Sequence, residues 1–106
     1  MADLLYNGVL EKLTGEQFDE EFEFDGIIPE STTVTYRTVT VTKANGMDAT
    51  ATAAISSSFT GSIVTVTLNT GSVETSYIIR VSVHASDATP AVMIKLLNVS
   101  LPGAYR

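Results

Sequence analysis

The residues most able to bind a metal ion or take part in a reaction are four acids at alternating positions in the stretch FDEEFEFD: Asp19, Glu21, Glu23 and Asp25. Carboxylate oxygens are the ligands that hard cations such as Ca²⁺ prefer. Alternate residues of a strand lie about 7 Å apart, so neighbours in this row cannot share one ion without oxygens from a loop. We therefore expect no metal site here, and we expect the row to face solvent or a partner.

A second group with reactive atoms is Ser82 with His84, the single histidine of the chain. A serine nucleophile needs a base in hydrogen-bonding geometry and an acid that orients the base, and no such acid can be assigned. Nothing in the sequence singles out two of the acids as a catalytic pair for glycoside hydrolysis. Asn98-Val99-Ser100 fits a glycosylation triplet, but we interpret it as part of a strand. The sequence predicts no enzyme, no catalytic residue and no cofactor.

Composition narrows the possible functions further. The 106 residues suffice for one domain with one core. With 6 Lys and Arg against 12 Asp and Glu, the net charge is −6, which argues against nucleic-acid binding. Without cysteine there are no disulfides, thiol nucleophiles or thiolate metal sites, and no apolar run approaches the ~20 residues of a membrane span. The start, MADLLYNGVLEKL, does not resemble a secretory signal, so we expect synthesis in a cytoplasm.

The clearest secondary-structure signal is the stretch TSYIIRVSVHA, residues 75–85. Apolar residues occupy every second position: Tyr77, Ile79, Val81, Val83 and Ala85. Because side chains alternate between the two faces of a strand, these five are expected to point into one core. The residues between them are mostly polar and suit the other face. The pattern predicts a half-buried antiparallel strand.

Similar but weaker patterns predict the other strands. They cover 18–25, 32–43, 49–55, 59–68 and 91–101. In 32–43, Val34 and Tyr36 share the parity expected in the core, while Val39 and Val41 have the other, so we expect a bulge near Arg37 and Thr38. Asn45-Gly46 is a strong turn signal because both residues tolerate positive φ. Six or seven short strands without a convincing interior helix predict an all-β fold, an antiparallel β-sandwich over residues 18–106.

Residues 1–17 differ in pattern from the rest of the chain and are expected to form an N-terminal arm. Their apolar residues are Leu4, Leu5, Val9, Leu10 and Leu13. Three interpretations stay open: a helix interrupted by Gly8, an apolar arm that docks on something larger, or a segment folded over its own domain.

The last strand, residues 91–101, is apolar on both parities. Leu97, Val99 and Leu101 are expected in the core, but an isolated sandwich normally keeps its outer face polar. The opposite parity is therefore predicted to contact neighbouring subunits, unless residues 1–17 cover it. The complete set of candidate interface residues is Leu4, Leu5, Val9, Leu10, Leu13, Ile78, Val92, Ile94 and Leu96.

Three stretches together resemble a family of small immunoglobulin-like structural proteins of tailed bacteriophages. EFEFDGIIPESTTV resembles their Phe-rich opening strand and turn, and NVSLPG falls where they end in an alternating strand. Between these, VTVTKANGMDATATAAISSSFTGSIVTVTLNTGSVETSYIIRVSV resembles their Val-Thr strands and closing hairpin. The chain departs from the pattern at Gly71-Ser72, where these proteins often carry Gly-Gly or Gly-Thr.

The resemblance, over roughly residues 18–101, implies an immunoglobulin-like sandwich that serves as a virion structural protein without enzymatic activity. It implies a capsid decoration or cement protein on the capsid surface, bridging major capsid protein subunits and forming a homo-oligomer. One alternative is a structural protein of the neck, the tail or the head–tail connector. Another is a carbohydrate-binding or adhesive module, although the chain has no Trp and only four Tyr to stack on sugars.

Overall fold

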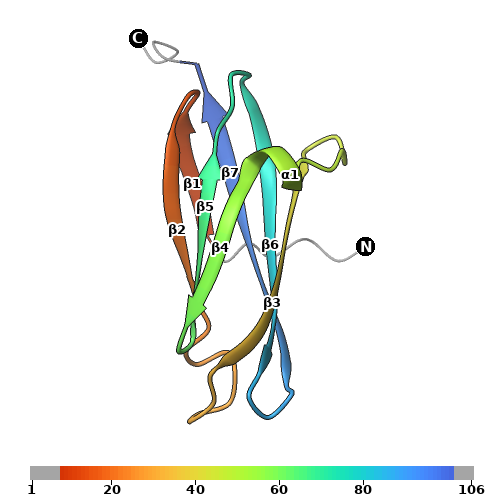
Figure 1. Ribbon diagram of the computed structural model, residues 1–106. Coiled ribbons are helices and arrows are strands. Elements are labelled where there is room, and N and C mark those ends of the chain that lie inside the picture. Colours follow the sequence, from red (N-terminus) through yellow and green to blue (C-terminus); the bar gives the residue numbers. More distant parts are fainter. Residues whose placement is uncertain (1–7, 102–106) are drawn as a thin grey trace.

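The computed structural model describes residues 8–101, whose strands form two sheets packed face to face (Figure 1). The elements in chain order are β1 (Gly8–Leu13), β2 (Gln17–Glu23), β3 (Val34–Lys43), α1 (Thr50–Ala53), β4 (Ala54–Thr60), β5 (Ile63–Asn69), β6 (Thr75–Ala85) and β7 (Pro90–Ser100). The all-β sandwich expected from the sequence is confirmed, with seven strands in the described residues.

The two sheets differ in size and in strand direction. The four-stranded sheet has the order β1-β7-β6-β3, and the three-stranded sheet has the order β2-β5-β4. All strand neighbours are antiparallel except β1 and β7, which are parallel. The expected antiparallel pairing holds from β2 to β7, and the parallel pair is added by β1, which lies in the segment expected to form an arm. The chain starts in the four-stranded sheet with β1 and crosses to the three-stranded sheet before β2.

Alternation along the central strands builds the core. All five inward residues predicted on β6 are buried, and the inward residues of β5 that face them, Val64, Val66 and Leu68, are fully covered. On β2 and just after it, Phe22 and Phe24 are likewise at 0% exposure. Leu101, by contrast, was expected in the core and is 47% exposed, because β7 ends at Ser100.

The register of β3 differs from the prediction. The irregularity lies between Val34 and Tyr36, before the expected bulge at Arg37 and Thr38. A shift of one residue moves every later side chain to the opposite face. Tyr36, expected inside, is therefore exposed, while the Arg37 side chain points between the sheets.

Residues 49–55 are not one strand as predicted, because Thr50–Ala53 form a single helical turn. The Asp48 carboxylate accepts hydrogen bonds from the Thr50 backbone N–H at 3.1 Å and from its hydroxyl at 2.7 Å. The same hydroxyl accepts a 2.9 Å bond from the Val41 N–H. These bonds turn the chain where alternation predicted an extended backbone. No helix in the described part of the chain is long and apolar enough to cross a membrane.

The described part of the N-terminal segment belongs to the sandwich. Residues 8–13 form β1 and pair with β7 from Gly8↔Lys95 to Leu13↔Ser100. This segment is thus extended and lies on its own chain, and the fold has no boundary between residues 17 and 18. Leu4 and Leu5 lie outside the described residues.

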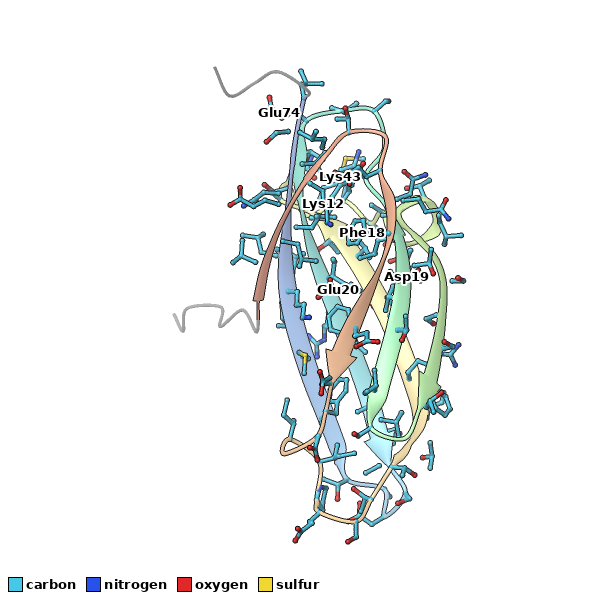
Figure 2. All side chains as sticks on the ribbon, turned by 90° about the vertical axis from the view of Figure 1, so that its left-hand side faces the viewer. Lys12, Phe18, Asp19, Glu20, Lys43 and Glu74 are labelled. Atoms are coloured by element: carbon cyan, nitrogen blue, oxygen red, sulfur yellow. The ribbon has the colours of Figure 1, made fainter. Side chains whose placement is uncertain are left out.

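Three cationic side chains close the margins between the sheets. Lys12 and Lys95 lie with Nζ 4.6 Å from the ring centres of Phe18 and Phe22, respectively, on β2. At the opposite margin the Arg37 guanidinium carbon is 5.3 Å from the ring centre of Phe59. Figure 2 shows Lys12 and Phe18 close together between β1 and β2. The alkyl stems of the three cationic side chains cover apolar surface, while their charged groups lie over aromatic rings.

Candidate interaction surface

The outer face of the four-stranded sheet carries a continuous group of apolar side chains. In the strand register, Val9 of β1 lies beside Leu96 of β7, and Leu96 lies beside Ile78 of β6. Ile94 and Val92 follow at alternate positions along β7, so they share this face. We call these five residues the apolar patch: Val9, Ile78, Val92, Ile94 and Leu96.

The patch is open to solvent at its margins. Val9 is 55% exposed and Val92 is 41% exposed, while Ile78, Ile94 and Leu96 are half-buried by their neighbours. Leu13, 40% exposed, lies on the same face at the end of β1. The strand register thus brings six of the predicted candidate residues onto one surface.

The other three candidates are placed differently. Leu10 has the opposite parity on β1 and packs against the core, so it is not available on this face. Leu4 and Leu5 fall in the residues that the structure does not describe. Leu10 could not be assigned from the sequence, because the face of a short strand becomes known only when its pairing is known.

Polar side chains surround the patch. Glu11 lies beside Asn98 on one side, and Arg80 lies beside Ile94 on the other. The Ser76 hydroxyl donates to Asn98 Oδ1 at 2.8 Å, and the outward residues of β3 include Thr38, Thr40 and Thr42. An apolar centre with a polar margin is the usual anatomy of a protein–protein interface.

One feature of this face was missed by sequence reasoning. Tyr36 stacks on His84, with ring centres 5.6 Å apart and planes inclined at 23°, and Tyr36 is 57% exposed. The Thr38 hydroxyl also donates to Tyr36 Oη at 3.3 Å. The misplaced bulge had assigned Tyr36 to the core, so no sequence signal paired it with His84. His84 thus has an aromatic neighbour, while Ser82 pairs with Thr38 in the ladder.

The acidic row lies on the other outer face, that of the three-stranded sheet. Asp19, Glu21 and Glu23 are exposed on β2, and Asp19 Oδ1 accepts a 2.7 Å hydrogen bond from the Thr67 hydroxyl. Figure 2 shows Asp19 and Glu20 directed to opposite sides of β2. Within residues 8–101, no group of three or more His, Cys, Asp or Glu side chains is placed to hold a metal ion.

A hollow of about 570 Å³ lies at one end of the sandwich. The loop from Asp25 to Glu30 lines it together with Thr89 from the turn between β6 and β7. Its wall combines the apolar side chains of Ile27, Ile28 and Pro29 with two carboxylates.

Two carboxyl groups of the turns have shifted titration. Hydrogen bonds from the Thr50 side chain and backbone hold the pKa of Asp48 below its usual value. Hydrogen bonds from Thr89 lower the pKa of Asp87 in the same way. Both side chains are fully exposed and bond to the residue two positions ahead, which explains the shifts by local turn structure.

No protein-family model matches this chain, and no curated protein is significantly similar to it.

Proposed function

We propose that this chain is a non-enzymatic structural protein of a bacteriophage virion, a capsid decoration or cement protein that bridges major capsid protein subunits. The observation that carries the proposal is the apolar patch around Leu96, on a sheet face that an isolated sandwich would keep polar. Such a face suits a subunit that is covered by neighbours in an assembly.

The strand order supports the immunoglobulin-like assignment within this proposal. Immunoglobulin sandwiches place the second, fifth and fourth strands in one sheet and the third, sixth and seventh strands in the other. Here β2-β5-β4 and β7-β6-β3 follow this division. The first strand joins the larger sheet, parallel to the last strand.

A cement protein acts by binding, without chemistry. A protein that binds adjacent capsid subunits only when they are assembled stabilises the assembled state by mass action. When one rigid protein contacts two capsid subunits, the first contact raises the effective concentration for the second, so the overall affinity exceeds that of either contact alone. A sandwich with a core fully buried between two sheets is a suitable rigid body for this task.

A carbohydrate-binding module is the second candidate, and the Tyr36–His84 stack favours it. Tyr36 is exposed and presents a ring on the same sheet face as the apolar patch. Aromatic rings of this kind stack on sugar faces. If this candidate holds, Tyr36→Ala abolishes retention on a glycan array while assembly on particles is unchanged.

Paired substitutions on the two outer faces test the structural role. Ile94→Asp with Leu96→Asp places two charges in the patch, and we expect a folded protein that no longer joins capsids lacking the wild-type protein. Ser58→Asp with Thr60→Asp adds the same charge to exposed positions of β4 and should leave particle binding intact. Equal particle binding by both variants would refute the role of this face.

A further inference from the structure

We infer that the apolar patch is covered by a second copy of this chain, related by a two-fold axis that passes over Leu96. In this dimer Arg80 of each copy pairs with Glu11 of the other. The inference rests on the proposed use of the patch as an interface between subunits. It adds the identity and the geometry of the neighbour.

The first observation is the symmetric position of the two charged residues around Leu96. Arg80 lies on β6 beside Ile94, and Glu11 lies on β1 beside Asn98. Each is thus one strand away from Leu96, by about 4.8 Å, and two residues along, by about 7 Å, in opposite directions. They are about 16 Å apart on one chain, which is too far for a mutual ion pair.

This placement fits a two-fold axis. The axis lies in the plane of the interface, passes over Leu96 and is perpendicular to the line between Arg80 and Glu11. It places Leu96 of one chain opposite Leu96 of the other. The same operation places each Arg80 opposite the other chain's Glu11. One axis therefore produces an apolar centre and two ion pairs, which is the self-complementarity that a two-fold dimer requires.

The distribution of charge favours a second copy although the chain has a net charge of −6. On the strands of this face, the outward positions within the described residues carry one carboxylate, Glu11, and one guanidinium, Arg80, together with the imidazole of His84. The acidic row of Asp19, Glu21 and Glu23 lies on the outer face of the other sheet. Two copies that meet through the four-stranded sheets keep these rows on opposite outer surfaces, where repulsion is weakest.

The size of the face is sufficient for a dimer. With a rise of about 3.3 Å per residue and a spacing of about 4.8 Å, the four strands cover about 600 Å² in projection. The relief of the side chains makes the accessible area larger than this projection. A stable interface buries about 800 Å² on each partner, so the dimer uses the whole outer face of the four-stranded sheet.

Sedimentation equilibrium of the purified full chain tests the inference without particles. We expect twice the chain mass of 11.3 kDa for the wild type and the single mass for Leu96→Asp. Arg80→Glu and Glu11→Arg should each raise the dimer dissociation constant at least about tenfold, because each places like charges together. The double variant restores opposite charges and should return to within about threefold of the wild type.

Glu23→Arg is the matched control, because it changes the net charge as Glu11→Arg does but lies on the other sheet. Its dissociation constant should equal that of the wild type. A monomeric wild type overturns the inference, as does a dimer that Leu96→Asp leaves intact. A double charge reversal without rescue overturns the proposed axis.

Removal of residues 2–7 distinguishes another occupant of the patch. If these residues of the same chain cover the patch, the wild type is monomeric and the truncated chain associates, which overturns the inference. A monomer that still joins particles through Ile94 and Leu96 would overturn the dimer while the proposed function stands. A dimer that joins no particles would overturn the proposed function while the inference of the dimer stands.

Discussion

Lys95 on β7 donates from Nζ to Glu20 Oε2 on β2 at 2.6 Å, an ion pair that joins the two sheets. The ammonium also donates to the backbone carbonyl of Glu21 at 2.8 Å. The side chains of the pair are 13% and 21% exposed, so solvent screens them less than a surface pair. The pair therefore contributes to the docking of one sheet on the other at this margin.

We expect Lys95→Met to lower the free energy of unfolding by about 1–3 kcal/mol, between the values for exposed and fully buried pairs. The reason is that Glu20 loses its cationic partner in a partly buried place. Denaturant unfolding measures the loss, and a double-mutant cycle with Glu20→Gln isolates the coupling. Glu21→Gln, on the exposed face of the same strand, is the control and should cost less than about 0.5 kcal/mol. A coupling of zero would contradict the structural role of the pair.

Thr70, in the loop after β5, joins this loop to the turn after β1. Its hydroxyl, wholly buried, donates to the Leu13 carbonyl at 2.8 Å and accepts from the Glu16 N–H at 2.9 Å. Thr70→Val has nearly the same shape but leaves both backbone groups without this partner, which should cost about 1–3 kcal/mol of unfolding free energy. Thr70→Ser keeps the hydroxyl and should cost less in the same denaturant titration. Equal losses for both variants would show that packing, not hydrogen bonding, matters at this position.

The shifted carboxyl group of Asp48 predicts a pH dependence. Because hydrogen bonds from Thr50 stabilise the ionised form, the pKa is lower in the folded state than the 3.8 of a free carboxyl. The stabilisation is fully present above the unfolded value and is lost as the pH falls through the lower folded value. In thermal unfolding, the difference between wild type and Asp48→Asn should shrink as the pH is lowered below about 4. A difference that stays constant from neutral to strongly acidic pH would contradict this prediction.

Ala88 offers a stabilising substitution. It lies in the turn between β6 and β7 with φ of 72°, a conformation that glycine adopts without steric cost. Ala88→Gly removes this strain but gives the unfolded chain more freedom, so we expect a net gain of about 0.5–1 kcal/mol in the free energy of unfolding. Ala85→Gly, in a buried strand position, should instead destabilise. A lower midpoint for Ala88→Gly in denaturant would refute the prediction.

The sequence predicted the faces of a strand most accurately where the core covers one face and the other face is polar. The alternation of β6 assigned all its inward residues correctly, and the turn at Asn45-Gly46 lies where it was expected. Local propensity failed at residues 49–55, where side-chain hydrogen bonds from Asp48 and Thr50 decide the conformation. In β3 the bulge lies between Val34 and Tyr36, before its expected position at Arg37 and Thr38, and this reversed the face of Tyr36.

The candidate surface depended on pairing, which alternation cannot reveal. The sequence indicated that Ile78 and Leu96 have outward parities, but their contact follows from the β6–β7 register. Val9 joins them through a parallel pairing between segments far apart in the chain. Lys95 was not singled out either, because a charged residue on an inward parity becomes intelligible only when Glu20 lies opposite to it.

Counting the copies bound to particles tests the proposed role most directly. The purified protein is mixed with capsids of the same phage that lack it, and bound copies are counted by quantitative gel and located by cryo-EM. The proposed role predicts density at every symmetry-equivalent position of the capsid, at contacts between major capsid protein subunits. A few copies at one vertex, or none on the capsid, would contradict a decoration or cement role.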